Sequence, residues 1–168
     1  IRASQGGASA EGIMAAIDSL GAIGNPRAVE PLVASARSAM KAHASQPNDY
    51  EYLFRLAQAL RKFQDARAIA AYLELEIALR EEPSRHWWKA LHERYDKDLD
   101  NVEPAIFAEV LNNPNPVVLV ECLRVVQLHG YQCCSSLDLL HCVIELLDHP
   151  QQEVRVASKE ALAKFASK

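Results

Sequence analysis

Seven cysteine and histidine side chains lie between residues 122 and 149, and both residue types can bind metals. They are Cys122, His129, Cys133, Cys134, His141, Cys142 and His149. A tetrahedral zinc site needs four converging ligands, commonly as two closely spaced pairs. None of the usual pair spacings occurs here, and adjacent residues such as 133 and 134 point in different directions. Cys122 and Cys142 fit apolar helix faces, where free cysteine behaves as a small hydrophobe. We therefore favour core packing over a metal site, and reduced thiols over a disulfide framework.

A second candidate is the aromatic pair Trp87 and Trp88, which Leu91 and Tyr95 follow. Residues 88, 91 and 95 share one helical face and fit a buried core. Trp87 points about 100° away from that face, so we expect it to contact a partner. The chain has no glycine-rich phosphate loop, and no motif places a nucleophile beside a base. We predict no catalytic activity and no cofactor.

The bulk composition narrows the functional classes. The chain has 168 residues, of which 49% are hydrophobic and 24% charged, which suits one globular domain with a continuous core. Its net charge of −4 disfavours a general nucleic-acid binder, because such proteins are usually strongly basic. No apolar run approaches the roughly 20 residues that cross a bilayer, and no charged-then-apolar leader opens the sequence. We expect a cytoplasmic protein.

The elements that must position these side chains have a helical period. In residues 52–63, apolar residues recur at 53, 56, 57, 60 and 63, and polar residues take the other side. Short breakers rich in Pro, Gly, Asn, Asp and Ser separate such segments and can cap the next helix. We predict a flexible N-terminal segment at 1–8 and a single all-α domain at 9–168. Its nine helices are expected at 9–23, 27–43, 49–63, 66–82, 84–96, 102–112, 115–129, 136–148 and 151–166.

From the second helix on, these helices pair into hairpins that start near residues 27, 66, 102 and 136. The segment AIDSLGAIGNPRAVEPL, residues 16–32, resembles the HEAT-like repeat of phycobilin lyase subunits and bacterial scaffold proteins. Residues 139–162 also resemble a HEAT unit, with Asp148 at the turn and Arg155 near the start of the second helix. The central hairpins match in helix spacing alone, and Leu119 stands where the family has arginine. The resemblance implies a right-handed α–α superhelix of stacked hairpins, in which Arg155 pairs with Asp148.

Two enzyme families with HEAT-like repeats fit the sequence poorly. Deoxyhypusine hydroxylases bind two irons through repeated His-Glu pairs, and this chain has one such pair, His92-Glu93. In the DNA alkylpurine glycosylases of this fold, tryptophan and acidic residues line a basic concave surface. The acidic balance of the present chain argues against that activity.

In HEAT-like solenoids the second helix of each hairpin generally lines the concave surface. The second helices here (49–63, 84–98, 115–130, 151–168) carry a formal charge of +4, and the first helices from residue 65 onward (65–82, 100–112, 136–149) carry −9. The helix at 26–43 departs from this rule with +2. Scatter of solvated charges explains the difference equally well. The alternative is a positive stripe that attracts an acidic partner. Its members are Arg55, Lys62, Lys89, Arg124, Arg155 and Lys159, with the structural role taking precedence for Arg155.

We therefore expect a non-catalytic interaction or scaffold module that binds a protein partner on its concave face, through Trp87 and the stripe. The resemblance also implies an alternative, an accessory subunit similar to a phycobilin lyase that holds a tetrapyrrole. Nucleic-acid binding through the stripe is a third, less favoured interpretation.

Overall fold

The computed structural model describes residues 10–43, 50–80, 99, 101–128 and 136–166. Over these residues the chain is helical and has no strand, which confirms the all-α prediction. Eight of the nine expected α-helices fall within this part of the chain; the expected helix at 84–96 and the segment 1–8 lie outside it. The elements are α1 (Ala10–Ile23), the 3₁₀ helix η1 (Pro26–Ala28), α2 (Val29–His43), α3 (Tyr50–Leu60), α4 (Ala66–Arg80), α6 (Pro104–Val110), α7 (Pro116–Leu128), α9 (Leu137–Glu145), η2 (Leu146–Asp148) and α10 (Gln152–Ala166).

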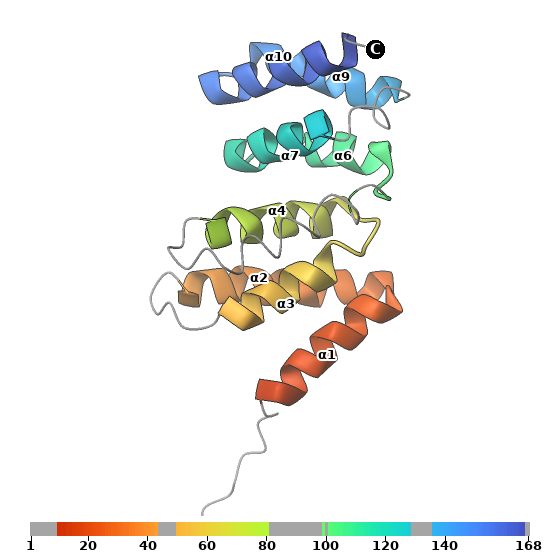
Figure 1. Cartoon of the computed structure of the whole chain (residues 1–168), viewed down its shortest axis with the longest axis vertical. Coiled ribbons are helices and arrows are strands. Elements are labelled where there is room, and N and C mark those ends of the chain that lie inside the picture. Colours follow the sequence, from red (N-terminus) through yellow and green to blue (C-terminus); the bar gives the residue numbers. More distant parts are fainter. Residues whose placement is uncertain (1–9, 44–49, 81–98, 100, 129–135, 167–168) are drawn as a thin grey trace, which may run out of the picture.

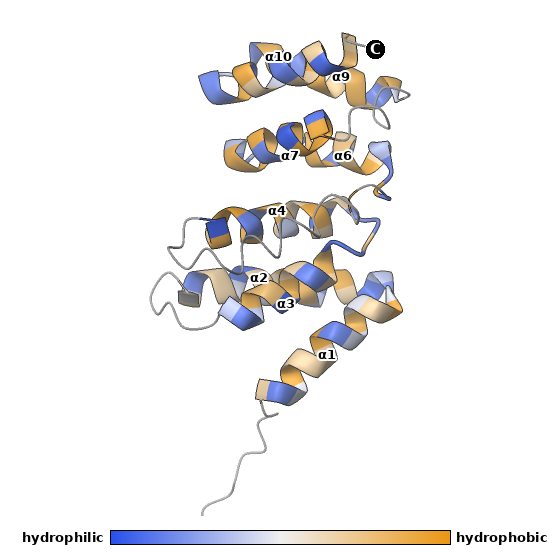
Figure 2. Cartoon of the chain, in the orientation of Figure 1, coloured by the Kyte–Doolittle hydropathy of each residue, from blue (hydrophilic) through white to orange (hydrophobic). Residues whose placement is uncertain are grey.

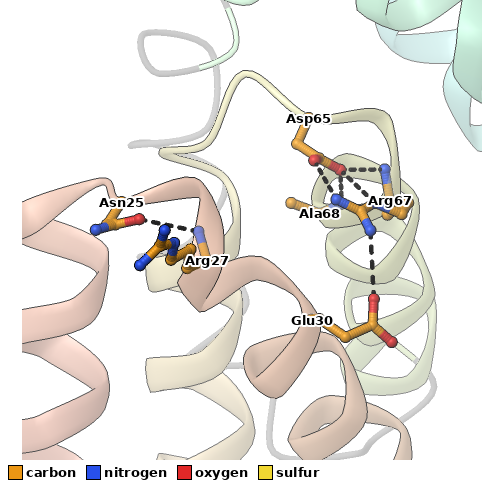
Figure 3. Close-up of polar contacts among 6 residues, drawn as sticks. All are labelled: Asn25, Arg27, Glu30, Asp65, Arg67 and Ala68. Atoms are coloured by element: carbon orange, nitrogen blue, oxygen red, sulfur yellow. Dashed lines mark hydrogen bonds and ion pairs between the residues drawn. The ribbon is translucent and has the colours of Figure 1, made fainter.

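Short polar side chains close the turns in front of several helices, as the breakers predict. The Asn25 side chain accepts a hydrogen bond from the backbone N–H of Arg27 at 3.0 Å (Figure 3). The Ser136 hydroxyl accepts one from the backbone N–H of Leu139 at 3.2 Å, at the start of α9. Proline occupies the first turn of η1, α6 and α7, where its missing N–H leaves no helical hydrogen bond unmade. These caps satisfy donors that a helix N-terminus otherwise leaves free.

Asp65 repeats the arrangement of Asn25 before α4 and adds a charge. Its Oδ1 accepts hydrogen bonds from the backbone N–H groups of Arg67 and Ala68 at 2.9 and 3.4 Å. The Arg67 guanidinium folds back onto the Asp65 carboxylate at 2.8 Å and reaches Glu30 of α2 at 3.4 Å (Figure 3). The hydrogen bond from the Arg67 side chain lowers the pKa of Asp65. The first turn of α4 is thereby tied both to its own cap and to α2.

The helices pack in two rows. In one row α2 contacts α4, α4 contacts α6, and α6 contacts α9. In the other row α1 packs on α3, and α7 packs on α10. Contacts between α2 and α3, α6 and α7, and α9 and α10 join the rows, so that the hairpins follow one another along the long axis of the molecule (Figure 1). Among the described residues, the first helices of the predicted hairpins thus form one row, and the contacts of the other are made by α1 and the second helices α3, α7 and α10.

A continuous apolar core fills the space between the rows. Leu53, Leu73, Leu123 and Leu139 come from four different helices and are all completely buried. The helices alternate along their length between hydrophobic and hydrophilic residues, which is the pattern of elements with one buried face (Figure 2). Each buried leucine side chain contributes about 2 kcal/mol by leaving water, which favours stacking over separate hairpins.

The described helices end within a few residues of the predicted boundaries. The predicted helix at 102–112 is helical only over Pro104–Val110, and that at 49–63 ends at Leu60. Both ends are set by turn hydrogen bonds that periodicity does not reveal. Gln64 donates to the Asn101 carbonyl at 2.8 Å and accepts from the Glu103 N–H at 3.0 Å, which fastens the turn after α3 to the turn before α6.

In the described residues, none of the helices combines the length and the apolar character that crossing a bilayer requires.

Candidate partner-binding surface

Five of the six stripe residues are described by the structure: Arg55, Lys62, Arg124, Arg155 and Lys159. All belong to the second helices or, for Lys62, to the turn after one, but their charges have different partners. Arg55 of α3 donates to the carboxylate of Asp18 on α1 and, at 3.1 Å, to Glu51 on its own helix. The hydrogen bonds to Glu51 and Asp18 raise the pKa of Arg55. Lys62, in the turn after α3, and Lys159, on α10, are exposed, and neither forms an ion pair with another described residue. Arg55 is therefore neutralised in place, while the two lysines remain open to solvent.

Arg124 of α7 belongs to an ion-pair network that joins α7 to α4. Its Nη1 lies 3.2 Å from Oε2 of Glu121, a carboxylate whose side chain is only 8% exposed. Both terminal nitrogens of Arg80, on α4, donate hydrogen bonds to the same carboxylate, one of them at 3.1 Å. A bidentate arginine–carboxylate pair is among the strongest side-chain interactions. Arg124 thus shares Glu121 with Arg80, and its side chain remains 55% exposed.

Glu76 of α4 lies next to this network and is completely buried. Arg80 is its nearest cation, at 3.6 Å, and Arg80 is already shared with Glu121. Burial raises the pKa of Glu76 to about 8, and the negative charge of Glu121 acts in the same direction. Hydrogen bonding from Tyr72 and the charge of Arg80 oppose the shift without reversing it. Of these two buried carboxyl groups, Glu121 is thus paired with arginines, and Glu76 favours its neutral form.

A shallow open groove of about 400 Å³ runs between α7 and α10. Its apolar part consists of Val120 on α7 and of Val156 and Ala157 on α10. Its polar lining adds Arg124 from α7 and Gln152, Glu153 and Glu160 from α10. The two helices are held together by Gln127, which donates to the Ala157 carbonyl at 3.1 Å and to Glu160 at 3.5 Å. Of the stripe residues, Arg124 alone lines this groove, and two carboxylates accompany it.

The predicted pairing of Arg155 with Asp148 is replaced by hydrogen bonds to the main chain. The Arg155 Nη1 donates to the carbonyls of His149 and Pro150 at 2.7 and 2.8 Å. No ion pair links its guanidinium to Asp148 within the part of the chain that is described, and the Asp148 side chain is exposed. A charge-assisted bond to two carbonyls fixes the turn between η2 and α10 as firmly as a carboxylate contact, and it leaves Asp148 in water. Arg155 thus keeps a structural role with different partners.

The cysteines that can be followed lie in the packing between helices. Cys122 of α7 is buried, and its thiol lies 3.9 Å from the Phe107 carbonyl. Cys142 of α9 is half-buried, and burial raises the pKa of its thiol. No group of three metal-ligating side chains converges in the residues covered by the structure. His129, Cys133 and Cys134 lie outside the described residues, as do Trp87, Trp88, Lys89 and the pair His92-Glu93.

The buried carboxylates Glu76 and Glu121 were not anticipated from the sequence, although it contains a signal for them. Glu76 follows the buried residues Tyr72 and Leu73 by four and three positions; Glu121 follows the buried Val118 by three positions and precedes the buried Val125 by four. An acidic residue at a core position of a helix indicates a buried ion pair or a neutral carboxyl group. The basic partner from another helix, here Arg80, cannot be identified from spacing alone.

Comparison with known protein families finds a match between residues 14–38 and the model of the PBS lyase HEAT-like repeat. The match covers α1 from residue 14 on, the turn with its Asn25 cap, and the first two thirds of α2. It confirms the resemblance that the sequence shows over residues 16–32. Comparisons with curated proteins and with solved structures give no match.

Proposed function

Starting from a chain that carries a HEAT-like repeat, we propose that it is a non-catalytic interaction or scaffold module that binds a protein partner on one face. In this proposal the hairpins follow a right-handed superhelix, and the second helices α3, α7 and α10 line its concave surface. The elongated two-row packing supports the proposal, because such stacks present long surfaces instead of one enclosed pocket.

The observation that carries the proposal is the groove between α7 and α10 together with the apolar side chains exposed near it. Val117 and Leu128 at the two ends of α7 are 51% and 65% exposed, and Val156 in the groove is 45% exposed. Large apolar side chains that stay in water around a concavity mark a binding surface. A partner that covers them gains the hydrophobic free energy that folding has left unused.

Site-specific photo-crosslinking in cells of the natural source tests this proposal. A photoreactive residue at position 156, in the groove, should form a defined crosslinked product. The same residue at position 34, on the exposed side of α2 in the other row, should not. Excess unlabelled protein should suppress the product, and excess Val156→Glu protein should not. Equal crosslinking at both positions would contradict a binding face on the second-helix row.

The charge of the partner is a separate matter. Arg55 and Arg124 are engaged with carboxylates of their own chain, so an acidic partner meets two free stripe cations, Lys62 and Lys159, in the described part. The acidic partner and the contact through Trp87 and Lys89 stay predictions. For nucleic-acid binding the stripe likewise lacks these two arginines as free cations. If the chain does bind nucleic acid, it should be retained on heparin, and the retention should fall steeply with salt.

Tetrapyrrole binding is the second candidate, and the family-model match favours it, since that model describes the repeat of PBS lyases. In such a role the protein holds a bilin while a partner enzyme attaches it. Titration of the purified protein with a bilin, followed by visible absorbance, separates the two candidates. A saturable spectral shift supports tetrapyrrole binding, and an unchanged spectrum supports the scaffold.

A further inference from the structure

The groove between α7 and α10 has an apolar floor with dimensions that suit side chains. Val120, Val156 and Ala157 form this floor, and a volume of about 400 Å³ is sufficient for several aliphatic side chains. Residues 117, 120, 124 and 128 lie on one face of α7 because they are three or four positions apart. The exposed Val117 and Leu128 therefore extend the same surface beyond both ends of the groove.

The charges around this floor are not balanced. Arg124 lies on the α7 side, where it shares the Glu121 carboxylate with Arg80. Glu153 and Glu160 lie on the α10 side and form no ion pair within the described part of the chain, although Glu160 accepts a hydrogen bond from the neutral Gln127. The other cations on α10 are Arg155, Lys159 and Lys164, and none of them lines the groove; Arg155 binds main-chain carbonyls. The groove lining thus carries two carboxylates and one guanidinium group.

These two carboxylates also define a spacing. Glu153 and Glu160 are seven residues apart on one helix face, which corresponds to about 10 Å along α10. A second helix lying along the groove places residues i and i+7 at the same separation and on one face. Between them, residues i+3 and i+4 project to the same side. A helix with basic residues at i and i+7 and aliphatic residues at i+3 and i+4 therefore matches the carboxylates and the floor together.

We propose that this groove binds a basic amphipathic helix of a partner protein, with Lys or Arg opposite Glu153 and Glu160 and aliphatic anchors against Val120 and Val156. The proposal rests on the partner-binding function proposed above and names the chemistry that the groove selects. It is opposite in sign to the acidic partner expected from the stripe, because Arg124 already contacts Glu121 and the lining sets two carboxylates against this one guanidinium group.

Selection from a display library of helical peptides tests the proposal directly. The library randomises positions i, i+3, i+4 and i+7 of a fixed helix and is panned against the whole chain. Lys or Arg should be enriched at i and i+7, with Leu, Ile, Val or Met between them. The best peptide should bind at least tenfold more tightly than its Glu-substituted counterpart at low ionic strength, and added salt should reduce the difference.

Two protein variants locate the binding. Glu153→Gln combined with Glu160→Gln should weaken binding of the selected peptide about tenfold, as expected for the loss of two solvent-accessible ion pairs. Both carboxylates are exposed, so folding should be unaffected. Glu109→Gln combined with Glu145→Gln makes the same charge change on exposed residues of the other row, and it should alter affinity less than twofold.

Several outcomes overturn the proposal: enrichment of acidic residues, the same enriched peptides from the double groove variant, or no enrichment. Selection of an apolar helix without charge preference would mean that the groove binds an uncharged partner. Concentration-dependent dimers that block peptide binding would mean that it binds a second copy of this chain. The crosslinking at position 156 keeps the two proposals apart. If position 156 forms crosslinks but the selected helix is acidic, the proposed binding function stands and the basic-helix inference is wrong. If there are neither crosslinks nor an enriched helix, both proposals are wrong.

Discussion

Arg55 lies between Asp18 and Glu51, and Arg124 lies beside Glu121. Solvent-accessible pairs of this kind contribute about 0–1 kcal/mol each to folding. Their larger consequence is on binding, because an incoming carboxylate must displace an internal one before it gains the arginine. Lys62 and Lys159 have no such competitor among the described residues. At the scale of single residues, formal charge therefore overstates what the second-helix row can offer an acidic ligand.

Gly21 gives the sharpest prediction at this scale. It is buried on α1, and a Cβ added to it would lie 2.8 Å from the Ala59 Cα of α3. Because the obstacle is backbone, α1 must move away from α3 to admit a methyl group. We expect Gly21→Ala to lower the free energy of unfolding by about 1–2 kcal/mol, since overpacking outweighs the gain of about 1 kcal/mol in helix propensity. Urea denaturation followed by circular dichroism measures the change.

Gly24 is the matched control for this substitution. Its φ of 66° is left-handed, and no atom lies within 4 Å of the position a Cβ would take. Gly24→Ala should cost about 1 kcal/mol through backbone strain alone. A second change, Ala59→Gly, removes the Ala59 Cβ that the added group would meet at 2.9 Å but leaves the Cα in place, so it should cost less stability in the Gly21→Ala protein than in the Gly24→Ala protein. A Gly21→Ala protein more stable than the parent would show that α1 does not approach α3 as closely as described.

The individual helix is the scale at which the sequence was most informative. The apolar period of 53, 56, 57, 60 and 63 located α3, and Asn25 marked the turn before η1 and α2. These features were predictable because they depend on neighbours in the chain. The end of α3 at Leu60 was not, since the Gln64 hydrogen bonds that fasten its turn come from beyond residue 100. The groove depends on which faces of α7 and α10 meet, and residue spacing does not contain that information.

The contact between α4 and α7 leads to a prediction about pH. Burial raises the pKa of Glu76 to about 8, above the 4.5 of an exposed glutamate. The folded state therefore holds this proton where the unfolded state releases it. The stabilising contribution is complete below about pH 4.5 and is lost as the pH rises through about 8. Glu76→Gln, which mimics the neutral form, should make the free energy of unfolding less dependent on pH between 5.5 and 8.5 and should raise it at pH 8.5.

Glu121→Gln is the comparison for that experiment. Glu121 is nearly as buried as Glu76 but is held by Arg80 and Arg124, so its neutral replacement leaves two guanidinium groups without their carboxylate. We expect Glu121→Gln to destabilise the fold by about 2 kcal/mol at both pH values. Urea titrations of both variants and the parent at pH 5.5 and 8.5 provide the measurement. If Glu76→Gln reduces stability at pH 8.5, then Glu76 is ionised and paired in the folded protein.

At the scale of the whole molecule, the two rows make each hairpin depend on its immediate neighbours. The extensive contacts of α9 and α10 are with α6, α7, η2 and each other, whereas α4 packs on α2, α3, α6 and α7. In a stack of this kind stability is approximately a sum of local terms, so one hairpin can open while the rest stays folded. The consequence for binding is direct, because α10 supplies most of the groove lining and its extensive contacts are confined to α7, α9 and η2.

Two leucine substitutions of the same chemistry measure this difference. Leu139 of α9 and Leu73 of α4 are both completely buried, so either one changed to alanine should cost about 2–5 kcal/mol locally. Hydrogen exchange read by mass spectrometry should show that Leu139→Ala speeds exchange in residues 137–166 and leaves α2 and α4 protected. Leu73→Ala should speed exchange in helices on both sides of α4, because all of them pack on it. Uniform loss of protection in the Leu139→Ala protein would mean that the stack unfolds as one unit. The groove could then not open independently of the HEAT-like end of the chain.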